Sequence, residues 1–215
     1  MAEIQWKGAI FDLDGTLLDS MGVWSQVDID FLKKRNLAVP EDYMQKIAAM
    51  GFPEAAKYPK ERFGFPDTPE MLVKEWREMA REAYAFHVTL KPGVKEYLEQ
   101  LKKQGIPIAA ATSGDGELFV PCLKHNEIYA HFDAFVTVAE VKRGKGFPDI
   151  YEAAAERIGV APADCMVFED LAAGIRGARD GGFQTTGILD DCSKEEWENI
   201  RKTADLVIHD FTELL

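Results

Sequence analysis

The chain has 215 residues, of which 47% are hydrophobic and 29% charged, enough for a folded protein of one or two domains with a substantial core. Its formal net charge of -12 excludes the broad basic surface that nucleic acids and anionic membranes attract, so we expect neither as a partner. No apolar run reaches the roughly 18 residues that a membrane-spanning helix needs.

The first expected strand leads into a pair of acids. The apolar run Gly8 to Ile10 predicts a buried strand, and Asp12 and Asp14 stand two residues apart where it ends. Because strand side chains repeat every two residues, both carboxylates can point into one site. Two charges about 4 Å apart repel by roughly 4 kcal/mol at an effective dielectric constant near 20. A cation, a shared proton or water must offset this repulsion. Gly15 allows the chain to turn sharply after the two acids, because glycine adopts positive φ angles readily.

A block without strands follows, over residues 21–88. Turn signals divide it into four predicted helices, at Val23–Lys34, Glu41–Ala49, Glu54–Arg62 and Glu70–His87. The pattern on either side of the block is that of an α/β domain. We therefore interpret residues 21–88 as a helical cap domain inserted into a core domain of residues 1–20 and 89–215. Hinges are expected at 20–22 and 90–93.

From Pro92 onward, short apolar strands alternate with helices. The predicted strands are Ile106–Thr112, Ala134–Val138, Cys165–Glu169, Gln184–Leu189 and Asp205–His209. The helices between and before them are predicted at 94–104, 117–126, 149–159, 172–181 and 193–202. Such alternation predicts right-handed crossovers and a parallel sheet covered on both faces, an α/β, Rossmann-like doubly wound core. Ligands of such sheets bind beyond the carboxyl ends of the strands.

The strand that ends at Thr112 runs into hydroxyl and glycine residues. Thr112, Ser113 and Gly114 offer hydroxyls and exposed backbone amides, which suit the oxygens of a phosphate group. The alternative is an ordinary helix start in which Ser113 or Asp115 is the N-cap.

A basic loop precedes the helix at 149–159. For Lys142 and Arg143 we favour a solvated role, whereas Lys145 lies between two glycines and its ammonium could reach an anion shared with the other strand ends. Asp149 is expected to cap the helix.

Two adjacent acids, Glu169 and Asp170, end the next strand. Asp170 could simply cap the following helix. Opposite Asp12 and Asp14 in the predicted sheet, however, metal binding is the better interpretation. The candidate ligands are all oxygens, with no histidine or cysteine at a suitable spacing, which favours Mg²⁺ over Zn²⁺.

Four motifs in this order resemble those of the haloacid dehalogenase superfamily of phosphotransferases. They are DxDGTLLDS from Asp12, ATSG ending at Gly114, a lysine four residues before Asp149, and FEDLAAGI from Phe168. The resemblance covers the whole chain, and the helical insertion looks like the first type of cap in that superfamily. Within it, the chain is most similar to the β-phosphoglucomutase-like phosphatases.

The resemblance implies roles for these residues. Asp12 would be the nucleophile that forms an aspartyl-phosphate, and Asp14 would protonate the leaving oxygen and then deprotonate the hydrolytic water. Groups at the strand ends would bind the phosphorylated substrate, namely Thr16, Thr112, Ser113, Gly114 and Lys145. The Mg²⁺ ligands would come from Asp12, Asp14, Glu169 and Asp170, with Asp14 acting through its carbonyl and Glu169 directly or through water.

Other members of the superfamily fit less well. Dehalogenases and phosphonatases lack the second acid of the first motif, which is present here as Asp14. Sugar-phosphate mutases add a histidine and an arginine, which would fall near Trp24 and Glu54. A receiver domain would not carry its phosphoacceptor in a first-strand DxDGT motif. The open alternatives are a β-phosphoglucomutase-like phosphomutase and a non-catalytic phosphate- or Mg²⁺-binding module.

We therefore expect a Mg²⁺-dependent phosphatase acting on a small phosphate monoester, such as a sugar phosphate. The cap would determine specificity for the leaving group of the substrate, and the loop from Met50 to Glu54 would reach the site. The start of the chain does not resemble a secretory signal, and its three cysteines are too far apart for a disulfide framework: Cys122, Cys165 and Cys192. A cytoplasmic location is expected, and a monomer, with a dimer as the alternative.

Overall fold

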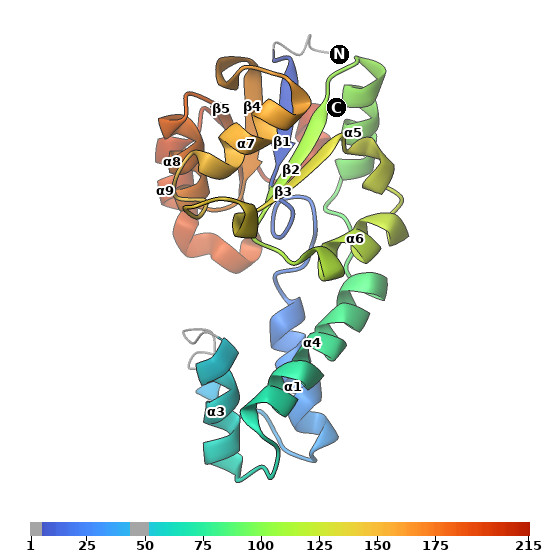
Figure 1. Ribbon diagram of the computed structural model, residues 1–215, viewed down its shortest axis with the longest axis vertical. Helices are drawn as coiled ribbons and strands as arrows, with labels where there is room; N and C mark the ends of the chain where they lie inside the picture. Colours follow the sequence, from blue (N-terminus) through green and yellow to red (C-terminus); the bar gives the residue numbers. More distant parts are fainter. Residues whose placement is uncertain (1–5, 44–51) are drawn as a thin grey trace. The chain divides into compact units, whose positions relative to one another are not determined.

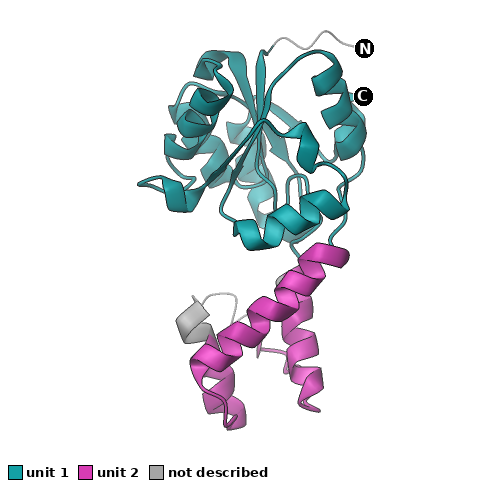
Figure 2. Ribbon diagram, turned by 45° about the vertical axis from the view of Figure 1, so that its right-hand side comes forward, with its two compact units in different colours: residues 1–21, 88–215 teal, residues 22–87 magenta. Residues whose placement is uncertain are grey.

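The computed structural model describes residues 6–43 and 52–215 (Figure 1). The chain divides into two compact units, residues 1–21 with 88–215 (the core unit) and residues 22–87 (the helical unit), shown in Figure 2. The boundaries expected from the sequence lie one residue away at each junction.

The core unit is built on six parallel strands in the order β3-β2-β1-β4-β5-β6. Their bounds are Gly8–Phe11 (β1), Ile108–Thr112 (β2), Ala134–Thr137 (β3), Cys165–Glu169 (β4), Gln184–Ile188 (β5) and Leu206–Ile208 (β6). From β1 the chain first adds strands on one side of the sheet and then, from β4 onward, on the other side. The carboxyl ends of β1 and β4 therefore lie at the switch point where such sheets bind ligands. The predicted α/β, Rossmann-like doubly wound core is confirmed.

Helices connect successive strands and cover both faces of the sheet. They are α5 (Val94–Lys103), α6 (Gly116–His125), α7 (Asp149–Ile158), α8 (Ala172–Asp180) and α9 (Trp197–Thr203). Ile10 and Val167 pack with residues of α7 and α8 in one buried cluster. Their neighbours Phe11 and Phe168 stack at 4.4 Å on the other face, where Tyr97 of α5 also packs.

Several element boundaries differ from those predicted, and two of the differences have a clear local cause. The strand expected from Ile106 begins at Ile108, because Pro107 has no N–H to donate to the sheet. The helix expected at 193–202 is preceded by a 3-10 segment, η4 (Asp191–Glu196), and α9 begins only at Trp197. Ser193 has non-helical φ and ψ angles there, and Asp190 caps the segment by accepting a hydrogen bond from the Cys192 amide at 2.7 Å.

The helical unit has a core of its own. It contains α1 (Val23–Lys34), α3 (Phe52–Phe63) and α4 (Pro69–Phe86), which bury aromatic residues including Phe31 and Trp76. Most of the helix predicted at Glu41–Ala49, and Met50 and Gly51 of the loop expected to reach the site, lie outside the described residues. The remaining residues, Phe52 to Glu54, are helical and not part of a loop, because α3 begins at Phe52. Contact of this segment with the site stays a prediction.

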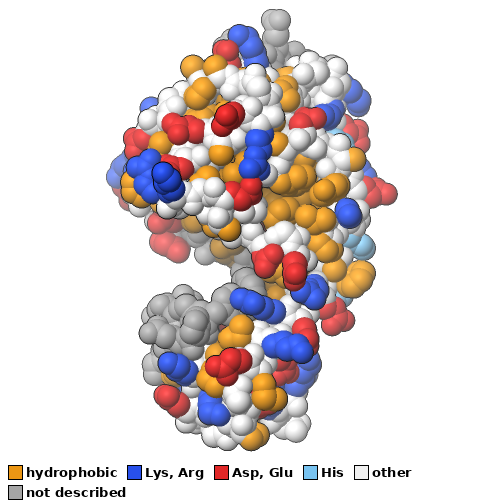
Figure 3. Space-filling view, in the orientation of Figure 1, with side chains coloured by type: hydrophobic (Ala, Val, Ile, Leu, Met, Phe, Trp, Pro, Cys, Tyr) orange, Lys and Arg blue, Asp and Glu red, His pale blue; other side chains and the backbone are white. Residues whose placement is uncertain are grey.

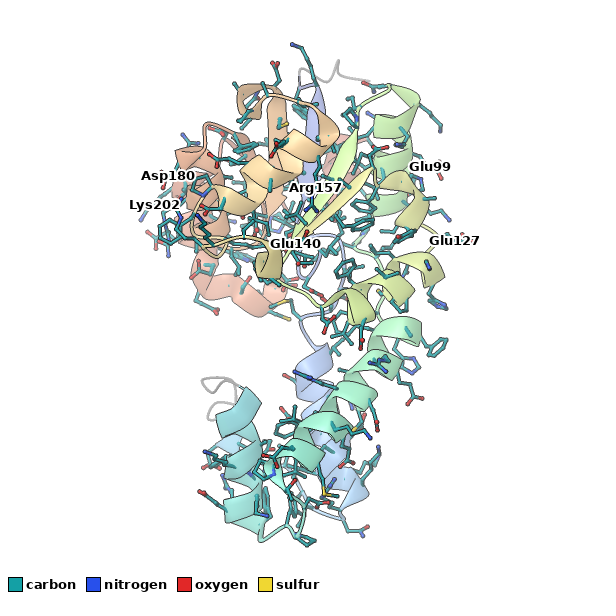
Figure 4. The ribbon with its side chains drawn as sticks, viewed as in Figure 1. Glu99, Glu127, Glu140, Arg157, Asp180 and Lys202 are labelled. Atoms are coloured by element: carbon teal, nitrogen blue, oxygen red, sulfur yellow. The ribbon has the colours of Figure 1, made fainter. Side chains whose placement is uncertain are left out.

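The surface carries charges of both signs. Figure 3 shows Lys and Arg side chains interspersed with Asp and Glu over the visible face of the core unit. At the edge strand β3, Arg157 donates to the Phe135 carbonyl and pairs with Glu140 at 2.6 Å (Figure 4). No described helix has both the length and the apolar character that spanning a bilayer requires.

Candidate active site

The acids at the carboxyl ends of β1 and β4 lie together. The two strands are neighbours, with Phe11 paired to Phe168, and the Asp12 amide donates to the Phe168 carbonyl at 3.0 Å. One carboxylate oxygen from each of Asp12, Glu169 and Asp170 lies within 4.8 Å of the other two. All three side chains are buried, so this triad concentrates negative charge where water gives little screening.

Lys145 supplies positive charge to the acid triad. Its Nζ donates to Asp12 Oδ1 and, at 2.6 Å, to Glu169 Oε1. Burial lowers the pKa of the Lys145 ammonium, but the charges of Asp12 and Glu169 outweigh this effect and raise that pKa above its usual value. Lys145 is therefore a fixed cation at neutral pH.

Thr16 and Gly15 shape the turn beneath the acids. The Thr16 hydroxyl is fully buried and lies 3.1 Å from Asp12 Oδ2 and 3.4 Å from Asp170 Oδ1. Gly15 has φ +82°, and a Cβ there would lie 2.8 Å from the carboxyl carbon of Asp170. Only glycine therefore fits both the backbone conformation and the space. The observed contacts of Thr16 are with the acids, and its contact with a substrate stays a prediction.

The triad also fits a divalent cation. Glu169 Oε2 and Asp170 Oδ2 are buried and have no hydrogen-bond partner among the described residues. Burial, with repulsion from Asp12 and Glu169, raises the pKa of Asp170 to about 9, and burial raises the pKa of Glu169 more than the charge of Lys145 lowers it. A cation would satisfy both oxygens and offset the repulsion, and an all-oxygen set suits Mg²⁺.

Asp14 is not part of this cluster. Its carboxylate Oδ1 accepts a 2.6 Å hydrogen bond from Ser20, a buried residue that the sequence indicates only as part of a hinge. No local spacing indicates this partner, because the turn from Asp14 to Leu18 has to fold back before Ser20 comes near. Metal binding by the Asp14 carbonyl stays a prediction.

The end of β2 lies next to Asp14. A Cβ at Gly114 would lie 3.1 Å from Thr112 Oγ1 and 3.2 Å from Asp14 Oδ2. The buried Thr112 hydroxyl accepts from the Gly114 amide at 2.9 Å. Asp115 is the N-cap of α6, and the Ser113 side chain is exposed, so a phosphate contact of Ser113 through its amide stays a prediction.

One capping assignment needs correction, and one alternative is excluded. Asp149 does not cap α7, whose N-cap is Pro148; it is the first helical residue and binds Arg143 at 2.6 Å. The Arg143 side chain is exposed, as expected for a solvated loop, and it is also paired, because a carboxylate six residues away faces it. Asp170 does not cap α8 either, since Leu171 is its N-cap. This leaves Asp170 available to the triad.

Sequence reasoning missed a further residue at the site. Tyr151, in the first turns of α7, donates its hydroxyl to Glu169 Oε1 at 2.9 Å, and both side chains are fully buried. Burial and the charge of Glu169 raise the pKa of the Tyr151 phenol, so it stays a donor. The helical pattern places Tyr151 among core residues, and only the packing of α7 on the sheet shows its polar contact.

Comparisons with known proteins show the family to which the chain is similar. A family model of haloacid dehalogenase-like hydrolases matches residues 6–182. The chain is 30% identical to the "Phosphorylated carbohydrates phosphatase" of Thermotoga maritima, over 83% of this chain and 82% of that protein. It is 29% identical to "Hexitol phosphatase A" of Escherichia coli, over 97% and 93%. The crystal structure of a "putative beta-phosphoglucomutase" from Thermotoga maritima has a TM-score of 0.83 and 27% identity, and 94% of each chain is covered.

Proposed function

The chain belongs to the haloacid dehalogenase-like hydrolases, and from this premise we propose that it is a Mg²⁺-dependent phosphatase that releases phosphate from a small monoester such as a sugar phosphate. The buried triad of Asp12, Glu169 and Asp170 beside a fixed ammonium is the observation that carries the proposal. The names of the two sequence relatives, both phosphatases of carbohydrates or hexitols, support the substrate class.

In the proposed reaction, a carboxylate oxygen of Asp12 attacks phosphorus and displaces the alcohol oxygen of the ester, which gives an aspartyl-phosphate. Asp14, protonated at this stage, delivers its proton to the departing oxygen. Asp14 then removes a proton from water, which attacks phosphorus and restores the Asp12 carboxylate. The two half-reactions together consume one water and return both acids to their starting forms.

Other residues of the site would neutralise and orient the phosphoryl group. Lys145 would hold a phosphoryl oxygen while still paired to Asp12, and Thr112 would add a hydroxyl from the end of β2. Asp12, Asp170 and the Asp14 carbonyl would hold the metal, with Glu169 beside them. Bound Mg²⁺ would supply the charge neutralisation that phosphoryl transfer chiefly needs.

A phosphomutase is the second candidate, because the similar crystal structure carries a β-phosphoglucomutase name. Hydrolysis is favoured because Trp24 and Glu54 stand near the positions where the resemblance would place the mutase histidine and arginine. The cytoplasmic location and the monomeric state stay predictions.

The test is phosphate release from a panel of monoesters, including p-nitrophenyl phosphate and several sugar phosphates, with Mg²⁺ and with EDTA. We expect Mg²⁺-dependent release that Asp12→Asn abolishes while its circular dichroism spectrum stays that of the wild type. Inactivity on the whole panel would support a binding module instead. Interconversion of a hexose phosphate, followed by ³¹P NMR without release of inorganic phosphate, would support the mutase.

A further inference from the structure

The two oxygens of the Glu169 carboxylate have different surroundings. Oε1 accepts hydrogen bonds from Lys145 at 2.6 Å and from Tyr151 at 2.9 Å. Oε2 is buried and has no partner among the described residues. Asp170 shows the same division, with Thr16 near Oδ1 and no partner for Oδ2 within the described part of the chain. Protein donors thus hold one oxygen of each acid, and the other is available to a cation.

Tyr151 is the more rigid of the two donors to Glu169. Its ring is fully buried in the cluster formed by α7 and the sheet, and it meets Phe183 edge to face at 6.2 Å. The hydroxyl is the only polar atom of that side chain, and burying it without a partner would cost free energy. Its place in the core therefore fixes where the hydrogen bond to Glu169 points.

Lys145 cannot orient Glu169 alone. Its ammonium is shared with Asp12 and sits on a flexible four-carbon stem. In the reaction proposed above, Lys145 also takes up contacts with the phosphoryl group. The proposed reaction gives Tyr151 no such second role, and its hydroxyl donates to Glu169 Oε1.

We propose that Tyr151 is a positioning residue of the metal centre, whose hydroxyl fixes Glu169 Oε1 and thereby keeps Oε2 available to Mg²⁺. The inference rests on the proposed Mg²⁺-dependent function. Groups that orient metal ligands in this way typically change metal affinity by about 10- to 100-fold. Because Lys145 still contacts Oε1 when the hydroxyl is absent, we expect the lower end of that range.

Tyr151→Phe removes the hydroxyl and keeps the ring, so the core packing is preserved. Tyr97→Phe is the matched control, since Tyr97 is also buried in the core unit and its hydroxyl has no hydrogen-bond partner among the described residues. Mg²⁺ affinity would be measured by isothermal titration calorimetry without substrate. We expect about tenfold weaker Mg²⁺ binding in Tyr151→Phe and unchanged binding in Tyr97→Phe.

Steady-state kinetics give a second readout that a purely structural role would not produce. At limiting Mg²⁺ the phosphatase activity of Tyr151→Phe should fall, and saturating Mg²⁺ should restore kcat to near the wild-type value. Equal Mg²⁺ affinities of the wild type and Tyr151→Phe would overturn the inference and leave the proposed phosphatase intact. Failure of the wild type itself to bind Mg²⁺ would overturn the proposed metal dependence, and the inference with it.

Discussion

Ser20 and Asp14 form the residue-scale contact that bears most directly on proton transfer. The 2.6 Å hydrogen bond fixes one oxygen of the carboxylate that we assign to acid and base catalysis. A single hydrogen bond of this kind contributes roughly 0.5–1.5 kcal/mol, so Ser20→Ala should lower kcat by about two- to tenfold. KM should change little, because the phosphate-binding groups remain. The measurement is the steady-state rate with p-nitrophenyl phosphate.

Ser25→Ala is the control for that change, because Ser25 is an exposed serine on α1. It should leave both constants unaltered. An equal fall of kcat in both variants, or no fall in Ser20→Ala, would remove Ser20 from any role in orienting Asp14.

Which site residues the sequence could reveal depended on how each is positioned. Asp12, Glu169 and Asp170 stand at the carboxyl ends of buried strands. Parallel strands bring such ends together, so the proximity of these acids was predictable. Ser20 and Tyr151 meet their acids through a closed turn and through helix packing. Neither arrangement leaves a signal in local spacing.

At the scale of elements, two glycines of α8 let the end of β4 and the loop that carries Lys145 pack closely against this helix. A Cβ at Gly174 would lie 2.5 Å from the carboxyl carbon of Glu169, and one at Gly177 would collide with the Lys145 carbonyl and lie 2.8 Å from the Phe147 amide. The loop that carries Lys145 therefore lies directly on the helix. This contact is between backbone atoms, which cannot rotate away as a side chain could.

Gly177→Ala should consequently displace the Lys145 loop. In an exposed helix interior the same change would stabilise by about 1 kcal/mol, but here we expect a loss of stability and a fall in kcat/KM of about tenfold or more. Gly144→Ala is the control in the same loop, since a Cβ there meets nothing within 4 Å. Urea denaturation and kinetics would show the two effects, and a Gly177→Ala variant that is more stable and fully active would contradict the argument.

Helix α1 contains a buried acid, Asp28, whose effect on folding stability depends on pH. Burial raises the pKa of Asp28 from 3.8 to about 7 in the folded protein. Between these values the folded state binds more protons than the unfolded state, so this contribution to stability rises as pH falls from 7 towards 4. The cost of the ionised carboxylate is fully present only above pH 7.

Asp28→Asn should therefore stabilise the protein at pH 8 by on the order of 1–2 kcal/mol, and by much less at pH 5. Urea denaturation at the two pH values measures the difference. Asp30→Asn, on the same helix and less buried, should give no such pH-dependent gain. A gain that is equal at both pH values would show that ionisation of Asp28 is not its cause.

At the scale of the molecule, alternation of strands and helices was enough to predict the doubly wound sheet. The strand-free block nearly coincides with the compact unit of residues 22–87, and its role as a cap domain stays a prediction. The residues at which helices begin were harder to predict from the sequence. Asp149 has the residue type of a cap but binds Arg143 instead, and η4 replaces the first turns of the predicted final helix because Asp190 holds the Cys192 amide. In both cases a tertiary or capping contact outweighs the local pattern.

The stability of the whole protein should also depend on Mg²⁺, because the acid triad repels itself in the folded state. A ligand that binds only to the folded state stabilises that state by about 2.7 kcal/mol when its concentration is a hundred times its dissociation constant. Asp170→Asn should raise stability without Mg²⁺ by on the order of 1–3 kcal/mol, since it removes a carboxylate whose pKa burial and two neighbouring acids raise to about 9. The same variant should lose most of the gain from Mg²⁺.

Asp180→Asn provides the comparison for the Mg²⁺ experiment, because Asp180 is an exposed acid at the end of α8 (Figure 4). It should keep the wild-type response to Mg²⁺ and its stability without the ion. Urea denaturation curves with EDTA and with Mg²⁺ measure all three proteins. If Asp170→Asn were less stable than the wild type in EDTA, electrostatic repulsion would not dominate the apo site. If it kept the full Mg²⁺ response, Asp170 would not be a ligand, because a carboxamide is a much poorer partner for a hard divalent cation than a carboxylate.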